Sequence, residues 1–206
     1  MSDTAHQHLL HATRDIKLLN QVIVHNGVLS IERQAPEQFF PYLARSITGQ
    51  QLSNSAAMTI WGRVELASEG DLLTFCQLDN RDQLRQCGLS NAKIRTLSGL
   101  RDAILNEYFE ADFYQSSDRE RITKQLTELW GIGEWTADMA AMFFFGLPNI
   151  WSEKDIALVR GLEKFARSES ISPTMILKLC EPYHTYLALH IWECWDTNLL
   201  TSLVRD

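Results

Sequence analysis

A short glycine-rich run in this chain has the composition of an anion-binding turn. Gly131-Ile132-Gly133 lies between two apolar helical patterns and is followed by Trp135 and Thr136. Glycine tolerates positive φ and has no side chain, so the turn would leave the first amides of the second helix exposed. Such amides, at the positive end of a helix dipole, suit a phosphate. A plain corner between two helices is the alternative, and it is the more common explanation of an isolated Gly-x-Gly.

A single aspartate stands out twenty residues beyond Trp135. Asp155 directly precedes the apolar-periodic stretch 156–167, and Glu153 is a competing acid two residues earlier. Aspartate is a preferred N-cap, and caps outnumber catalytic carboxylates. Capping and catalysis are compatible, because a cap hydrogen bond would fix the carboxylate and help to keep it ionised.

Helical periodicity extends over nearly the whole chain and places these residues at turns and helix starts. The predicted helices cover residues 6–24, 36–50, 53–67, 79–86, 90–109, 119–130, 134–145, 155–167, 173–179 and 183–195. Ser53 and Ser90 are predicted caps, and Gly27 and Gly88 are predicted helix ends. No alternating strand of convincing length occurs. The sequence therefore predicts an all-α fold of about ten helices, as one unit over residues 1–206 with two helical lobes and a cleft between them.

Composition narrows the class of protein further. The chain has 206 residues, of which 45% are hydrophobic and 22% charged. No apolar run approaches the ~20 residues that span a bilayer, and the N-terminus lacks the pattern of a secretory signal, so we expect an intracellular, non-membrane protein. The formal charge of −7 opposes nucleic-acid binding, which gains most from clustered Lys and Arg. The histidines His6, His8 and His11 are expected to lie on a solvated surface.

Several motifs in a fixed order resemble one known family. The run from Leu129 to Ala137 (LWGIGEWTA), followed by Asp155, resembles the helix-hairpin-helix DNA glycosylases, and within them the alkylpurine (3-methyladenine, type II) enzymes. The stretches RSITGQQLS (45–53), GLSNAK (88–93) and PYHTY (182–186) are similar to the same family. The resemblance covers roughly residues 37–195, and the extra N-terminal β-rich domain of longer members has no room here.

The resemblance implies a chemistry for several residues. Asp155 matches the catalytic aspartate, which stabilises the positive charge that develops on the sugar as the base leaves, and Glu153 does not fit the spacing. Trp135 and Tyr183 match aromatic positions of the pocket that receives a flipped, cationic base. Met139 and Ile156 stand where longer bacterial members have tyrosines, so we expect a less aromatic pocket and a changed range of lesions.

The resemblance also implies contacts with double-stranded DNA. Backbone amides of the hairpin would hold phosphates on one flank, and the 88–93 turn with Lys93 and Arg95 would hold them on the other. The loop after Gly49 would supply the wedge that fills the gap left by the flipped base. The implied DNA-binding residues are Gly131, Gly133, Thr136, Gly88, Ser90 and Lys93, and the wedge is Gln51, Leu52 or Ser53, with no ground for choosing among the three.

No cofactor is expected to be required. The carbonyls of Thr127, Leu129 and Ile132 are candidates for a bound Na⁺ or K⁺, as hairpins of this family can hold one. The four cysteines show no Cys-x-x-Cys pair, and only Cys180 and Cys194 lie late in the chain, so we expect no iron–sulfur cluster. Trp135 occupies the position of the Schiff-base lysine of strand-cutting relatives, which favours a monofunctional enzyme.

The resemblance thus predicts a glycosylase that removes alkylated purines such as 3-methyladenine and 7-methylguanine in base excision repair. We expect a monomer, cytoplasmic in a bacterium or nuclear in a eukaryote. A non-catalytic helix-hairpin-helix module that only binds DNA is the alternative from another class. A glycosylase for another lesion, or one with lyase activity, is the alternative within the enzyme class.

Overall fold

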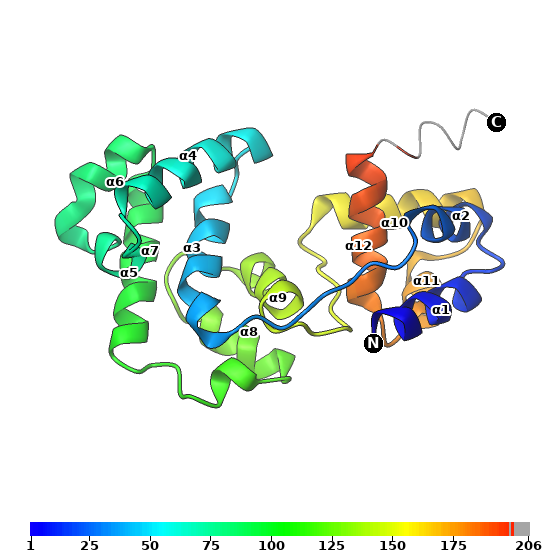
Figure 1. Cartoon of the computed structure of the whole chain (residues 1–206). Coiled ribbons are helices and arrows are strands. Elements are labelled where there is room, and N and C mark those ends of the chain that lie inside the picture. The colour runs from blue at the N-terminus through cyan, green and yellow to red at the C-terminus, as the bar shows by residue number, and fades with distance from the viewer. Residues whose placement is uncertain (198, 200–206) are drawn as a thin grey trace. The chain divides into compact units, whose positions relative to one another are not determined.

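The computed structural model describes residues 1–197 and 199. Twelve α-helices and three 3₁₀ helices lie in this part of the chain, and no strand does (Figure 1). The α-helices are α1 (Ser2–Ala12), α2 (Lys17–Asn26), α3 (Phe39–Gly49), α4 (Asn54–Ala67), α5 (Leu72–Phe75), α6 (Arg81–Cys87), α7 (Asn91–Leu105), α8 (Arg119–Thr127), α9 (Glu134–Phe143), α10 (Ile156–Ser168), α11 (Pro173–Cys180) and α12 (His184–Asp196). The 3₁₀ helices are η1 (Pro36–Gln38), η2 (Leu78–Asn80) and η3 (Phe113–Gln115). The predicted all-α class is confirmed, and none of the described helices is both long and apolar enough to span a bilayer.

The single helix predicted over residues 6–24 is wrong, because the chain breaks between α1 and α2. The Thr13 hydroxyl donates to the Leu9 carbonyl at 2.7 Å, and the Asn20 amide donates to the Leu10 carbonyl at 2.9 Å. The Leu9 carbonyl thus accepts from the Thr13 hydroxyl as well as from the Thr13 N–H, and the Asn20 side chain from α2 supplies a partner for the Leu10 carbonyl at the end of α1. The short helix α5 accounts for the other addition to the predicted number.

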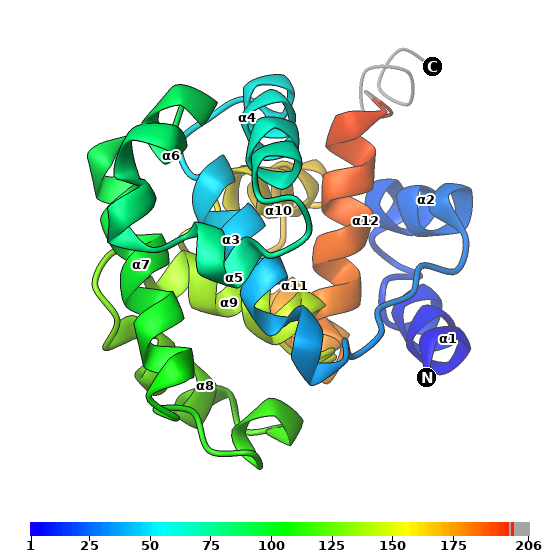
Figure 2. The ribbon, with the colours of Figure 1, turned by 60° about the vertical axis from the view of Figure 1, so that its left-hand side comes forward.

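The chain forms two compact units. Residues 33–145 make one, which we call the hairpin unit, and residues 1–32 with the described residues from 146 onward make the other, which we call the aspartate unit. In the hairpin unit α3 contacts α4, α7 and α9 (Figure 2). In the aspartate unit α12 contacts α1, α2, α10 and α11.

An aromatic cluster fixes the base of α3 in the hairpin unit. Phe39, at the start of α3 and 1% exposed, meets Phe109 and Phe144 edge-on, with ring centroids 5.1 and 5.0 Å apart. Edge-to-face pairs of this kind each add about 0.5–1.5 kcal/mol beyond the burial of area. Since Phe144 directly follows α9, the cluster holds α3 and α9 in a fixed relation.

Close packing also fixes α10 in the aspartate unit. A Cβ added to Gly161 of α10 would overlap the Ile191 side chain of α12, so the two helices approach as closely as glycine allows. The Trp195 indole donates to the Ala157 carbonyl at 3.1 Å and secures the first turn of α10. The helix that follows Asp155 is therefore held rigidly by α12.

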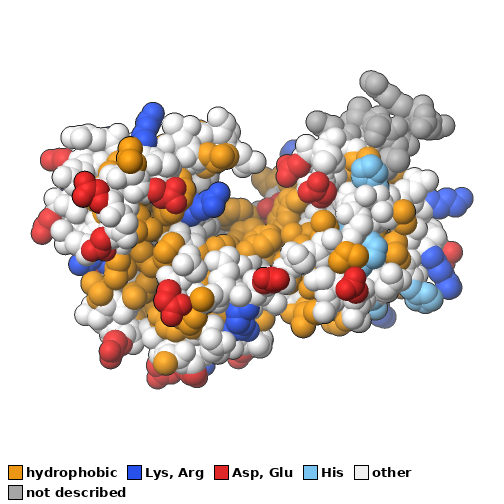
Figure 3. All heavy atoms as spheres, viewed as in Figure 1, with side chains coloured by type: hydrophobic (Ala, Val, Ile, Leu, Met, Phe, Trp, Pro, Cys, Tyr) orange, Lys and Arg blue, Asp and Glu red, His pale blue; other side chains and the backbone are white. Residues whose placement is uncertain are grey.

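Acidic side chains are spread over the surface on the face that Figure 3 shows. They lie singly in both units, with Lys and Arg side chains and uncharged atoms between them. The net charge of −7 is therefore not gathered into one acidic patch on this face.

Candidate functional site

The turn between α8 and α9 uses its two glycines differently. Gly131 has φ +83°, and a Cβ there would overlap the Thr96 hydroxyl of α7, so both conformation and packing require glycine. Gly133 is the N-cap of α9 with φ −103° and ψ 176°, which any residue adopts, and nothing lies within 4 Å of an added Cβ. Gly133 thus supplies no side-chain cap and leaves open space at the start of α9.

Two side chains join the hairpin to the loop after α3. The Gln50 amide donates to the Thr136 hydroxyl at 3.0 Å and to the Gly131 carbonyl at 3.4 Å. The Lys93 ammonium of α7 donates to the carbonyls of Thr48 and Gln50, both at 2.8 Å. The stretches 45–53, 88–93 and 129–137 therefore form one connected assembly within the hairpin unit.

These contacts change the interpretation of two predicted DNA-binding side chains. Thr136 is 2% exposed and its hydroxyl accepts a hydrogen bond from the Gln50 amide, so this side chain lies inside the hairpin unit, and its contact with DNA stays a prediction. Lys93 is likewise engaged with backbone carbonyls, and its desolvation lowers the pKa of the ammonium group. Both side chains therefore help to hold the assembly together.

The loop between α3 and α4 exposes all three wedge candidates. Gln51 has φ +57°, which is uncommon for a residue with a Cβ, and Leu52 is 38% exposed. Ser53 is the N-cap of α4, and its hydroxyl accepts the Ala56 N–H at 3.3 Å. Gln51 and Leu52 are therefore better placed than Ser53 to leave the protein surface.

The turn between α6 and α7 follows the predicted pattern. Gly88 closes α6 with φ +107°, and Ser90 caps α7 by accepting the Lys93 N–H at 3.2 Å. Both residues are exposed. The predicted helix end and cap are confirmed, while their contact with DNA stays a prediction.

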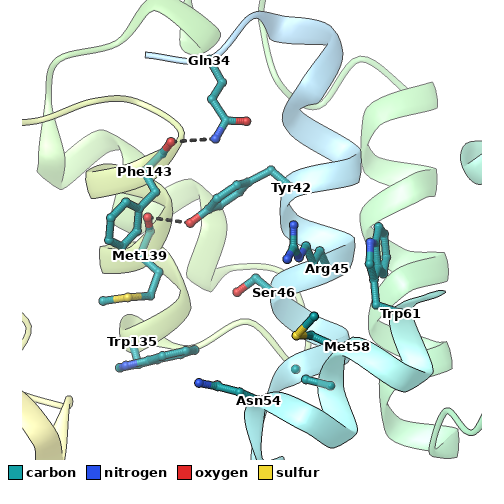
Figure 4. Close-up of a pocket in the computed structure, with 12 residues that line it drawn as sticks. Gln34, Tyr42, Arg45, Ser46, Asn54, Met58, Trp61, Trp135, Met139 and Phe143 are labelled. Atoms are coloured by element: carbon teal, nitrogen blue, oxygen red, sulfur yellow. Dashed lines mark hydrogen bonds between the residues drawn. The ribbon is translucent and has the colours of Figure 1, made fainter. Parts of the chain in front are cut away.

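A pocket of about 560 Å³ lies in the hairpin unit and includes two predicted pocket residues, Trp135 and Met139. Figure 4 shows Arg45 and Ser46 of α3 on one side and the α9 residues on the other. The Tyr42 hydroxyl donates to the Met139 carbonyl at 2.8 Å, and burial raises the pKa of this phenol. The lining also contains Trp61, Phe143 and Asn54 and no carboxylate, so aromatic faces and neutral polar groups dominate it.

Asp155 caps α10 in the aspartate unit, as its position predicts. Its Oδ1 accepts the Leu158 N–H at 2.9 Å, and its own N–H donates to the Ser152 carbonyl at 3.2 Å. The side chain is partly exposed. One oxygen is thus held by the helix start, which fixes the direction of the carboxylate.

The loop that leads to Asp155 is tied to the first turn of α12. The buried Thr185 hydroxyl donates to the Leu147 carbonyl at 2.6 Å and accepts the Ile150 N–H at 3.0 Å. The Thr185 N–H donates to the Pro148 carbonyl at 3.0 Å. These bonds cross-link both ends of residues 147–150, a role that no local sequence signal indicated.

The remaining predicted pocket residues also lie in the aspartate unit. Tyr183 precedes α12 and meets the His8 ring edge-on, with centroids 5.1 Å apart, while Ile156 is 65% exposed at the start of α10. His6 is only 9% exposed and faces His190 at 6.0 Å, so its predicted place on a solvated surface is wrong. The cause is the packing of α1 on α12, which a pattern within α1 cannot reveal.

Comparison with known proteins finds chains of similar sequence and fold among the 3-methyladenine DNA glycosylases. DNA-3-methyladenine glycosylase 1 of Schizosaccharomyces pombe is 26% identical over 184 residues, covering 85% of this chain and 78% of the relative. A structure of 3-methyladenine DNA glycosylase from the same yeast with abasic DNA superposes with a TM-score of 0.76 at 24% identity, covering 92% and 95% of the two chains. The DNA-3-methyladenine glycosidase of Bacillus halodurans gives a TM-score of 0.67 at 26% identity, covering 89% and 86%. No family model matches the chain.

The chain is therefore similar over most of its length to the 3-methyladenine DNA glycosylases. Of the residues predicted from the resemblance, the hairpin unit holds the hairpin glycines, the tip of the loop between α3 and α4, and the pocket residues Trp135 and Met139. The aspartate unit holds Asp155 together with Ile156 and Tyr183. Each unit therefore carries a chemically distinct share of the motifs that define the glycosylases.

The groups predicted for metal ions in this family have identifiable positions. Thr127 ends α8, and the Leu129 carbonyl accepts the Ile132 N–H at 3.2 Å, which leaves it a second lone pair. Carbonyl oxygens of this kind suit a hard cation. Cys180 and Cys194, the two late cysteines, are buried thiols, and burial raises the pKa of Cys180 to about 12.

Proposed function

We propose that this protein is a monofunctional DNA glycosylase that hydrolyses the N-glycosidic bond of alkylated purines in base excision repair. The similarity to a DNA-3-methyladenine glycosylase over 85% of the chain carries the proposal. The two units supply the groups that the reaction needs: the aspartate unit an oriented carboxylate, and the hairpin unit an aromatic pocket wall and helix-start amides.

Asp155 is the proposed catalytic carboxylate. A purine alkylated at N3 or N7 carries positive charge, so it leaves as a neutral base and takes the electrons of the glycosidic bond with it. Positive charge then develops on the sugar, which a carboxylate stabilises while water adds to C1′ and loses a proton. The cap bond from the Leu158 N–H holds Oδ1 of Asp155 and so orients the carboxylate.

Trp135 is the proposed principal wall for the flipped base. Its indole borders the pocket, and an electron-rich aromatic face attracts a cationic purine by stacking and cation–π contact. Arg45 also borders the pocket, and no carboxylate does, so formal charge in this pocket adds no attraction for a cation. Discrimination then rests on the aromatic faces and on neutral donors such as Asn54 and Ser46.

The hairpin is the proposed anchor for the DNA backbone. Gly133 leaves the start of α9 open, where helix-start amides can meet a phosphate. A monovalent cation on the carbonyls of Thr127, Leu129 and Ile132 would add positive charge at the same turn, and a difference in DNA affinity between K⁺ and tetramethylammonium buffers at equal ionic strength would reveal it. We place the reaction wherever the genome is kept, in the cytoplasm of a bacterium or the nucleus of a eukaryote.

Release of free base from methylated duplex DNA tests the proposal directly. Wild type should release methylated purines and leave abasic DNA intact, and borohydride should trap no covalent adduct because Trp135 replaces the Schiff-base lysine. Asp155→Asn should lower release by at least about 10²-fold while binding to an abasic-site duplex is kept. Asparagine also caps helices well, so the variant should fold.

The matched control is Glu153→Gln, which removes an exposed acid two residues away and should keep normal turnover. Normal turnover of Asp155→Asn would reject Asp155 as the catalytic residue. Binding without any base release by wild type would identify a DNA-binding module in place of an enzyme.

A further inference from the structure

Two exposed side chains that the proposed reaction does not use lie in contact beside the hairpin. Trp130, the residue before Gly131, is 50% exposed. The guanidinium carbon of Arg95, from α7, lies 4.1 Å from the centroid of its ring. A half-exposed tryptophan covered by an arginine is not a core residue, so this pair needs a separate explanation.

The pair stands on a rigid base. Gly131 lies directly against Thr96, the residue after Arg95, and the Thr96 hydroxyl donates to the Ala92 carbonyl at 3.0 Å. Gln50 holds the Gly131 carbonyl from the other side. Both partners are therefore placed by packed backbone, and the guanidinium is ordered by the indole before any ligand arrives.

The stacked guanidinium has its donors available. Among the described residues no carboxylate lies within ion-pair distance of Arg95, whereas Arg101 on the same helix is paired with Asp102 at 2.7 Å. Stacking uses the face of the guanidinium and leaves the N–H groups at its edge free. Such a planar, preorganised fork matches the oxygens of a phosphate diester.

We propose that Arg95 and Trp130 form a DNA-backbone contact, binding a phosphate that neighbours the one at the hairpin amides. The inference rests on the proposed function, because it takes duplex DNA as the ligand. Arg95 donates to the phosphate oxygens, and Trp130 fixes the guanidinium and covers the adjoining backbone with its indole. The contact adds affinity and register without reading sequence.

Salt-dependent binding of the full-length protein to a duplex with an abasic-site analogue tests the contact. Between about 50 and about 200 mM salt, Arg95→Gln should make the log–log salt slope shallower by about 0.9, the value for one lost phosphate contact. Affinity at the lower salt should fall about tenfold. Arg101→Gln, which makes the same charge change on α7 at an already paired arginine, should leave the slope unchanged.

The coupling between the two side chains is tested by a double-mutant cycle. Trp130→Leu keeps apolar bulk but removes the aromatic face, and it should weaken binding about 2- to 5-fold, the range of an exposed cation–π contact. The double variant Arg95→Gln/Trp130→Leu should lose less affinity than the two single losses combined.

If Arg95→Gln binds the duplex with the affinity and salt slope of the wild type, the proposed contact is overturned, while the proposed glycosylase function still stands. If the double variant loses as much binding free energy as the two single variants together, Trp130 does not act by stacking on Arg95, and the role assigned to the pair is overturned. Failure of the wild type to bind the abasic duplex would overturn the proposed function as well, and it is recognised by appearing without any substitution.

Discussion

Alanine at the two hairpin glycines should have different effects, although both belong to one turn. Gly131 has φ +83°, where a side chain costs about 1–2 kcal/mol. Its Cβ would also overlap the Thr96 hydroxyl and lie 3.0 Å from the Thr96 methyl carbon, and such overpacking typically costs about 1–3 kcal/mol. Gly131→Ala should therefore lower the free energy of unfolding by about 2–5 kcal/mol.

Gly133→Ala should leave stability nearly unchanged. Its backbone is extended and its surroundings are open, so an added methyl meets nothing. The loss of a favourable glycine cap, up to about 1 kcal/mol, is offset by a loss of unfolded-chain entropy worth about 0.4–1 kcal/mol. The methyl group does narrow the approach to the first amides of α9, so binding of abasic duplex DNA should weaken even though the protein stays folded.

Calorimetry and DNA binding separate these effects. At about 2–4 °C per kcal/mol for a chain of this length, Gly131→Ala should melt roughly 5–15 °C lower, and Gly133→Ala within about 3 °C of wild type. Adding Thr96→Ala to Gly131→Ala should restore the part of the unfolding free energy that is lost to the steric overlap. The loss that comes from the positive φ, about 1–2 kcal/mol, should remain. Equal melting temperatures for the two glycine variants, or no recovery by Thr96→Ala, would refute the reasoning.

Two further predictions concern the aspartate unit. Thr185→Val should cost about 2–5 kcal/mol by leaving the Leu147 carbonyl and the Ile150 N–H buried without a partner, and it should slow base release, whereas Thr185→Ser should behave as wild type in denaturant unfolding and turnover. Burial, with a smaller effect of His6, lowers the pKa of His190 to about 4, below the unfolded value of 6.5. Only the unfolded chain binds this proton between those values, so stability is full above about pH 6.5, falls as the pH drops and has lost about 3 kcal/mol below pH 4. Urea unfolding across this pH range measures the loss of stability. If the unfolding free energy of His190→Gln changes with pH as steeply as that of the wild type, His190 is not its cause.

Features governed by local sequence were predictable. The caps Ser53, Ser90 and Asp155 each accept an N–H three residues ahead, a contact determined by residue type at a helix start. The helix ends at Gly27 and Gly88 follow from the positive φ that glycine adopts without strain. The all-α class follows from periodicity alone.

Features that depend on distant partners were not predictable. Lys93 has the residue type and position of a phosphate ligand, yet the carbonyls of Thr48 and Gln50, more than 40 residues away in sequence, engage it. The motif treats Gly131 and Gly133 alike, and only the approach of Thr96 separates them. The break after α1 likewise depends on Asn20 in the next helix.

The engagement of cations inside the hairpin unit bears on how an acidic protein binds DNA. Lys93 holds carbonyls, and Arg101, Arg119 and Arg121 are paired with carboxylates. Helix-start amides bind phosphate through dipoles that carry no net charge, so they release few counterions. Wild-type binding should therefore depend weakly on salt, with a log–log slope well under about 5, in contrast to proteins that neutralise 6–10 phosphates with Lys and Arg. A slope of about 6 or more would mean that a larger set of cations meets the DNA, and that the hairpin amides with Arg95 are a minor part of the interface.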